Sequence, residues 1–208
     1  MEQVVQSGNS MKCRVDAAGQ LNSMLDCSVP TEGLFWDTML SVPTIRELRS
    51  EEELFRCVGL LRAAFGTVAR DFGLTEESAP TNAAFTTLEN LRWHVQNGLT
   101  LYGMHCGATL VGCVAIKKSK GDEAVFYIER LAVDPENRHR GYGDQLLSFA
   151  VEHIRGIGGT TASIGLMDNN ERLKEWYRSK RFVQHDCRRI AHLPFKVCFM
   201  SKNLVDRN

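Results

Sequence analysis

The sequence predicts a mixed α/β domain in which a central, mostly antiparallel seven-stranded sheet is flanked by about four helices. Two observations lead to this fold class. From residue 42 onward, segments with the two-residue period of strands alternate with segments that have the 3.6-residue period of helices. Three of the strand-like runs also follow one another with connections of hairpin length, which predicts an antiparallel meander.

The first strand and the first helix adjoin each other near the start of this regular region. Residues 42–48 are predicted as the strand. Ser50 and Glu53 then form a capping box, in which the two side chains satisfy backbone N–H groups of the first helical turn. Apolar residues recur behind the box at helical spacing, which predicts a helix over 50–66.

A second capping box, Thr86 with Glu89, predicts the start of the next helix. Asn97-Gly98 predicts its end, because glycine after a helix readily adopts the left-handed conformation. The intervening residues 67–85 contain glycine and proline and are predicted as a loop. Such a loop could line the mouth of a substrate site.

Three β-rich runs follow: Leu99–His105, Leu110–Ile116 and Val125–Val133. They are separated by Cys106-Gly107 and by Lys118–Asp122, and both connections are short enough for hairpins. The three runs are therefore predicted to form the antiparallel meander.

The last part of the chain alternates helices and strands. An apolar stripe predicts a helix after the third run, and its members are Leu146, Leu147, Ala150 and Ile154. A strand over Thr161–Leu166 and a helix over about 170–179 come next. Two strands near Phe182–Asp186 and Lys196–Leu204 complete the predicted sheet.

Composition and charge exclude several classes of protein. The 25 basic and 25 acidic side chains balance, so a duplex-binding protein, whose affinity comes from neutralising phosphates, is not expected. No apolar run reaches the roughly 20 residues that span a membrane. The seven cysteines include no C-x-x-C pair and no histidine at ligand spacing, so we expect reduced thiols, no metal site and a cytoplasmic location.

The N-terminal part differs from the rest of the chain. Residues 1–41 are mostly small and polar and keep neither period for two turns, which predicts an N-terminal extension ahead of a domain over 42–208. Polar residues stand where a secretory signal would be basic and then apolar, so we expect no export. A homodimer through the extension or the last strands stays open.

The most informative segment is the glycine-bearing stretch that follows the third run, because it joins a strand to a helix. Unsatisfied N–H groups and the positive end of the helix dipole attract anions, and Gly141 and Gly143 would let a phosphate approach the backbone. Arg138 and Arg140 add cationic forks that suit a diphosphate. An ordinary capping turn with both arginines in solvent is the alternative. Neither a Walker loop nor a dinucleotide loop fits these glycines.

The pattern Arg138-x-x-Gly141-x-Gly143, after the strand end L-A-V-x-P, resembles the acetyl-CoA-binding motif Q/R-x-x-G-x-G/A of the GNAT superfamily of N-acetyltransferases. The order of predicted strands and helices is similar to the family's order. The resemblance implies a sheet that splays between its fourth and fifth strands, acetyl-CoA as co-substrate, and a cofactor diphosphate held by the loop. The loop residues are Arg138, His139, Arg140, Gly141, Tyr142 and Gly143.

A second motif lies about 30 residues downstream. Family members often carry N-x-x-A-x-x-x-Y-x-x-x-G-F, and this chain has Asn170, Leu173, Tyr177, Arg181 and Phe182 at those positions. Leu173 replaces the small residue of the pattern. Arg181 replaces its glycine, from which we expect a turn that does not need glycine geometry.

The mechanism that the resemblance implies is direct acetyl transfer to a primary amine of a small molecule or a peptide. The pantetheine arm would pair with the backbone of Leu131, Ala132 and Val133, and Asn170 would contact the arm while it caps its own helix. Tyr177 would give a proton to the departing thiolate, because a phenol stays protonated at neutral pH.

The base is predicted to be Glu129, whose carboxylate would accept the proton of the amine directly or through water. Strand alternation places its side chain on one face with Tyr127, Leu131 and Val133. A salt bridge to a neighbouring strand is the alternative for Glu129, and core packing is the alternative for Tyr177. For the whole protein, a non-catalytic acyl-CoA-binding module, a longer acyl group and a covalent cysteine route stay open.

Overall fold

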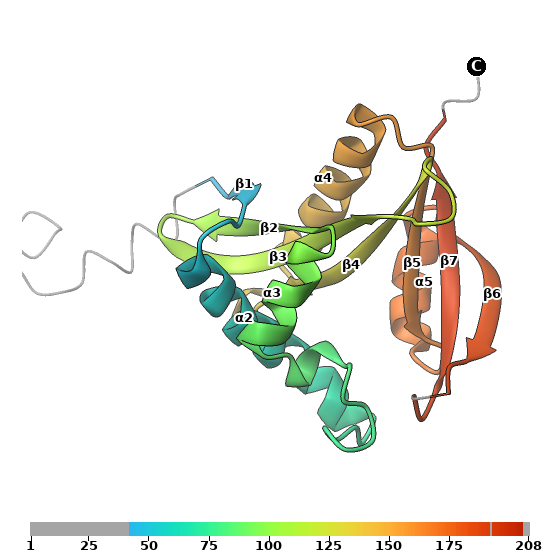
Figure 1. Cartoon of the computed structure of the whole chain (residues 1–208), viewed down its shortest axis with the longest axis horizontal. Coiled ribbons are helices and arrows are strands. Elements are labelled where there is room, and N and C mark those ends of the chain that lie inside the picture. The colour runs from blue at the N-terminus through green and yellow to red at the C-terminus, as the bar shows by residue number, and fades with distance from the viewer. Residues whose placement is uncertain (1–41, 192, 206–208) are drawn as a thin grey trace, which may run out of the picture. The chain divides into compact units, whose positions relative to one another are not determined.

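The computed structural model describes residues 42–191 and 193–205. In this part of the chain, seven strands form one mixed sheet in the order β1-β2-β3-β4-β5-β7-β6, with helices on its faces (Figure 1). The predicted fold class is confirmed. The extension predicted over 1–41 lies outside the described residues. Within the described ranges, no helix has the length and apolar character to cross a membrane.

The N-terminal elements are the strand β1 (Thr44–Glu47), the helices α2 (Glu51–Asp71) and α3 (Leu88–Gln96), and the short 3-10 helix η1 (Ala83–Phe85). The Ser50–Glu53 capping box is present: Glu53 N donates to Ser50 Oγ (3.2 Å) and Ser50 N donates to Glu53 Oε2 (2.9 Å).

Two predicted boundaries in this region are wrong. Helix α2 ends at Asp71, five residues beyond the predicted end at 66. Ala69 in its last turn is buried, and this burial stabilises the longer helix. The cap of α3 is Thr87, whose side chain accepts from Asn90 N (3.1 Å). Thr86 is instead buried, and its hydroxyl donates to the side chain of Asn90 (3.3 Å).

The predicted meander is confirmed. Strands β2 (Leu99–Cys106), β3 (Thr109–Lys118) and β4 (Val125–Val133) pair antiparallel in sequence order, and β1 pairs with the free edge of β2. These strands form the half of the sheet on which α2 and α3 lie.

The second half of the chain adds the helices α4 (Tyr142–Gly156) and α5 (Glu171–Ser179) and the strands β5 (Thr161–Met167), β6 (Val183–Arg189) and β7 (Lys196–Asn203). Strand β5 runs parallel to β4 and antiparallel to β7, which pairs in turn with β6. The single parallel contact thus joins the meander to the C-terminal strands.

Two hydrophobic clusters lie on opposite faces of the sheet. One contains side chains of α4 and α5 with residues of β2 to β5 and β7, and the other contains side chains of α2 and α3 with residues of β2 to β4. We call these the α4/α5 face and the α2/α3 face. Each strand of the meander therefore contributes alternate residues to two cores.

Candidate active site

Strands β4 and β5 diverge along their length. Their parallel pairing is limited to Val125–Tyr127 of β4 and Thr161–Ser163 of β5 (Figure 1). Beyond these pairs, β4 stays hydrogen-bonded to β3 and β5 stays hydrogen-bonded to β7. The edges of residues 128–133 and 164–167 that face each other lack a strand partner, so their backbone N–H and C=O groups can pair with an extended ligand. The predicted splay is confirmed.

A β-bulge interrupts β4 in this diverging part. Ala115 of β3 pairs with Glu129, whereas Cys113 pairs with Ala132, so two residues of β4 face one residue of β3. Arg130 is at the bulge and has a φ of 50°, in the left-handed region that non-glycine residues rarely adopt.

The bulge overturns the predicted alternation around Glu129. Glu129 pairs with Ala115 of the α2/α3 core and so lies on the α2/α3 face, whereas Leu131 and Val133 pack into the α4/α5 core. The prediction that all three share a face is wrong, because one extra residue in the strand shifts the two-residue period by one position.

The loop after β4 leads into the N-terminus of α4. A 3-10 turn, η2 (Pro135–Asn137), precedes α4. Gly141 is the N-cap of α4, with a φ of 78° and no side-chain hydrogen bond to the helix. Gln145 N, which donates to Gly141 O (3.1 Å), makes the first backbone bond of the helix. The N–H groups just before Gln145 therefore have no intrahelical acceptor, and this is the arrangement that binds phosphate.

The two arginines of the loop are placed differently. Arg138 Nη2 donates to Ala64 O (2.8 Å) and to Thr67 Oγ1 (3.1 Å), both on α2, and its Nε donates to Val133 O (3.4 Å). Arg140 is exposed. The guanidinium of Arg138 therefore ties the loop to α2, while that of Arg140 is accessible to a ligand.

Asn170 is the N-cap of α5, and Tyr177 lies on this helix and packs into the α4/α5 core. The predicted cap is present, since Leu173 N donates to Asn170 Oδ1 (3.1 Å). Tyr177 is 7% exposed, and its ring makes edge contacts with Trp176 (centroids 4.8 Å apart) and Phe182 (5.5 Å). Burial raises the pKa of Tyr177 above its ordinary value of 10. Its hydroxyl therefore holds its proton throughout the neutral range.

The turn between α5 and β6 corrects another prediction. Arg181, which stands at the position where the family pattern has glycine, has a φ of 66°. The expectation that this turn does not need glycine geometry is wrong, because the backbone adopts the left-handed conformation even with an arginine side chain.

Two residues that sequence reasoning missed lie near Glu129. Arg130 Nη1 donates to Glu129 Oε2 (2.9 Å). His94, in the last turn of α3, has its pKa lowered first by burial and then by the charge of Arg130. No motif marks either residue: the bulge that turns Arg130 toward this face has no signature in the sequence.

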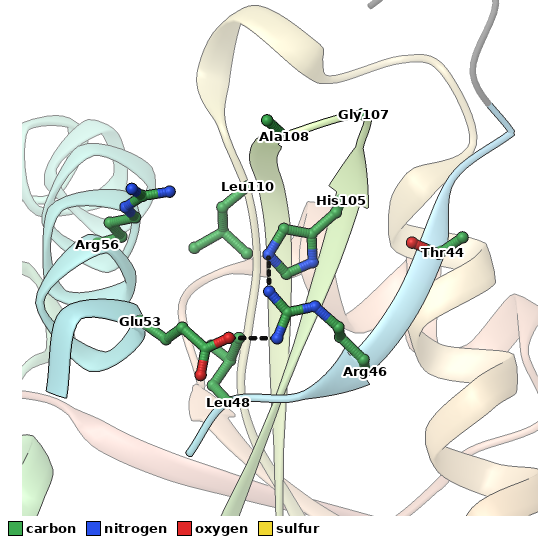
Figure 2. Close-up of a pocket in the computed structure, with 9 residues that line it drawn as sticks. All are labelled: Thr44, Arg46, Leu48, Glu53, Arg56, His105, Gly107, Ala108 and Leu110. Carbon is green, nitrogen blue, oxygen red and sulfur yellow. Dashed lines mark hydrogen bonds and ion pairs between the residues drawn. The ribbon is translucent and has the colours of Figure 1, made fainter. Parts of the chain in front are cut away.

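A cavity of about 280 Å³ lies elsewhere, between β1, the start of α2 and the β2–β3 turn. Arg46 stands between Glu53 and His105 in this cavity and bonds to both (Figure 2). His105 is 9% exposed, accepts from Arg46 through Nε2 (3.4 Å) and bonds Gly103 O through Nδ1 (3.2 Å). These side chains satisfy one another's hydrogen-bonding groups and hold β1 against α2. The residues that line the cavity therefore have a structural role.

Comparison with known proteins agrees with the fold described above. The family model described as "Acetyltransferase (GNAT) family" matches residues 67–182. A search of curated proteins finds no match. Among solved structures, the chain is similar to the ribosomal-protein-S18-alanine N-acetyltransferase from Escherichia coli, at 14% identity and a TM-score of 0.62, over 80% of this chain and 97% of that one.

Two further similar structures were solved with a bound coenzyme. The PaiA N-acetyltransferase from Thermoplasma acidophilum, in complex with coenzyme A, is 19% identical with a TM-score of 0.63, over 78% of this chain and 99% of that one. The yncA protein from Salmonella typhimurium, with its cofactor acetyl-CoA, is 15% identical with a TM-score of 0.59, over 81% and 97%. At these identities the likeness concerns the fold.

Proposed function

Because the chain belongs to the GNAT family of acetyltransferases, we propose that it transfers the acetyl group of acetyl-CoA directly to a primary amine of a small molecule or a peptide. The observation that carries the proposal is the divergence of β4 from β5 beside the N-terminus of α4. It supplies an unpaired strand edge for an extended, amide-rich arm and unsatisfied N–H groups for its diphosphate.

The cofactor would be held mainly by backbone. In this proposal the N–H groups from His139 to Gly143 bind the diphosphate, and Arg140 adds a charge-assisted contact. The unpaired edge of Leu131, Ala132 and Val133 binds the pantetheine arm, and Asn170 contacts the arm from α5. Arg138, whose guanidinium bonds to α2, braces the loop for this contact.

The reaction divides between the two faces of the sheet. Acetyl-CoA supplies a thioester whose carbonyl an amine can attack, with a thiolate as leaving group. In this proposal Tyr177, on the α4/α5 face, holds the proton that this sulfur takes up, and the N–H of Val133 polarises the carbonyl. Glu129, on the α2/α3 face, accepts the proton of the amine. In this proposal the acetyl group passes between the diverging strands β4 and β5, from acetyl-CoA on the α4/α5 face to the amine on the α2/α3 face.

The solved neighbours support the cofactor and the kind of acceptor. Two of them hold coenzyme A or acetyl-CoA, and one is named for acetylating the alanine of a ribosomal protein. An acceptor amine on a peptide or on a small molecule is consistent with the bound coenzymes and with the named acceptor of these neighbours.

Calorimetric titration of acetyl-CoA tests the proposal, with two matched glycine variants. Gly141 (φ 78°) and Gly158 (φ 86°) are both left-handed, and at both a Cβ meets nothing within 4 Å. Gly141→Ala and Gly158→Ala should therefore cost the same strain, about 1–2 kcal/mol of stability. Only Gly141→Ala should also weaken acetyl-CoA binding, because only that loop holds the diphosphate.

Thiol release with a panel of amines then tests catalysis. Absence of saturable binding by the unmodified protein would refute the cofactor assignment. Binding without turnover of any amine would instead identify a non-catalytic acyl-CoA-binding module.

A further inference from the structure

Arg130 is a largely buried cation with an incomplete set of partners. Its side chain is 11% exposed, and its one ion pair among the described residues joins Nη1 to Glu129. Arg130 Nε is fully buried and has no hydrogen-bond partner. A guanidinium carries five N–H donors, and a buried charge is normally both paired and hydrogen-bonded. The Nε–Nη2 edge of Arg130 therefore lacks an acceptor.

His94 provides an independent second observation. Its Nδ1 is also fully buried and without a partner, and its pKa responds to the charges of Arg130, Glu129 and Lys117. Arg130 Nε and His94 Nδ1 are thus two buried polar atoms without partners, and the charge of Arg130 acts on His94. A neutral imidazole with its proton on Nδ1 and the free edge of the guanidinium are both hydrogen-bond donors, so the ligand that suits either of them is an acceptor.

The local charges indicate the sign of that acceptor. Arg130 and Lys117 are the cations, and Glu129 is the carboxylate, whose charges act on His94. The side chain of Glu129 is also 37% exposed, so solvent screens part of its charge. This region of the α2/α3 face therefore carries an excess of positive charge.

The backbone at Arg130 shows that this placement has a structural cost. A φ of 50° is unfavourable for any residue with a Cβ, by about 1–2 kcal/mol. The bulge turns Arg130 to the same face as Glu129, the residue proposed to accept the amine proton. Strain of this kind is typical of positions where a side chain is aimed at a ligand.

We infer that the Nε–Nη2 edge of Arg130, together with His94 Nδ1, binds a carboxylate of the acceptor, so that the substrate is an amino acid or a close analogue. This deepens the proposed function and rests on it. Arg130 and Glu129 are neighbours on β4, so the carboxylate and the amine of the acceptor lie close together, as they do in an α-amino acid. Because Arg130 Nε and His94 Nδ1 are fully buried in the ligand-free protein, binding is accompanied by a side-chain rotamer change, which is common in binding sites.

Matched acceptor pairs test the inference. Thiol release from acetyl-CoA is measured for L-alanine and L-phenylalanine against alaninamide and phenylalaninamide, which keep the amine and lose the negative charge. The carboxylates should be preferred by about 10- to 100-fold in kcat/KM, the range expected for hydrogen bonds to a charged group. Equal kcat/KM values for both members of each pair would overturn the inference.

Three variants assign the preference to Arg130. Arg130→Met should reduce the ratio of the two kcat/KM values to near one, and Arg130→Lys should retain part of it because the charge remains. The control, Arg62→Met, removes an exposed arginine of α2 and should leave the ratio unchanged. A ratio that persists in Arg130→Met would assign the preference to another group and refute the inference.

Calorimetry separates failure of this inference from failure of the proposed function. Both amino acids are titrated into protein saturated with coenzyme A, so that binding is read without turnover. If coenzyme A itself does not bind, the proposed function fails. If it binds and neither amino acid binds more tightly than its amide, only the carboxylate site is refuted.

Discussion

Removal of the hydroxyl of Tyr177 separates catalysis from cofactor binding. Tyr177→Phe keeps the ring and its edge contacts with Trp176 at 4.8 Å and Phe182 at 5.5 Å. The free energy of unfolding should therefore change by less than about 1 kcal/mol, since only one hydroxyl is lost. Loss of a positioned general acid should lower kcat by about 10²- to 10⁴-fold. The Kd of acetyl-CoA should stay constant, because the proposed cofactor contacts are made by the loop and the strand edge.

The pH dependence of kcat adds a second reading. Burial holds the pKa of Tyr177 above its ordinary value of 10, so the phenol stays protonated across the neutral range. The unmodified enzyme should consequently show no loss of kcat below pH 10 that is due to ionisation of Tyr177. Steady-state kinetics with a good amine acceptor, over pH 6 to about 9.5, measure this.

Tyr102→Phe is the matched control. Tyr102 is also buried, and its hydroxyl bonds to His153 Nε2 (2.9 Å) on α4, among residues that belong to no proposed part of the site. This variant should lose about 1 kcal/mol of stability and keep its kcat. A kcat for Tyr177→Phe within threefold of the unmodified enzyme would refute the assignment of Tyr177 as the acid.

Three further outcomes are expected. Arg181→Gly should stabilise the protein by up to about 1 kcal/mol in urea unfolding, because glycine adopts a φ of 66° without strain. The pKa of Glu53 is lowered from 4.5 to about 2, first by the hydrogen bond from the backbone N–H of Ser50. The ionised carboxylate of Glu53 therefore stabilises the fold above pH 4.5, and this stabilisation is lost as the pH falls toward 2. Glu53→Gln should therefore flatten the fall in stability across that interval, again measured by urea unfolding. Arg138→Met should raise the Kd of acetyl-CoA about tenfold in calorimetry, since it breaks charge-assisted bonds to Ala64 O and Thr67 Oγ1 that brace the loop.

Local chemistry was sufficient to predict most elements and the glycine loop before α4. The bounds of β4 agree with the predicted run Val125–Val133, and the Ser50–Glu53 box and the cap by Asn170 form as expected. Each of these depends on residues within a few positions of one another, so a single sequence contains the full pattern. The loop at 138–143 was found for the same reason, because its glycines and arginines are contiguous.

The sequence by itself determined the order of elements, the glycine loop and the position of Tyr177 on α5. Tertiary structure alone decided which face of β4 carries Glu129 and Arg130, since the bulge is defined by pairing with β3 and not by β4's own residues. It also decided the partner of Arg138, which lies on α2, 71 and 74 positions away in the chain. Such contacts are absent from any local window, because they form only when distant segments pack against each other.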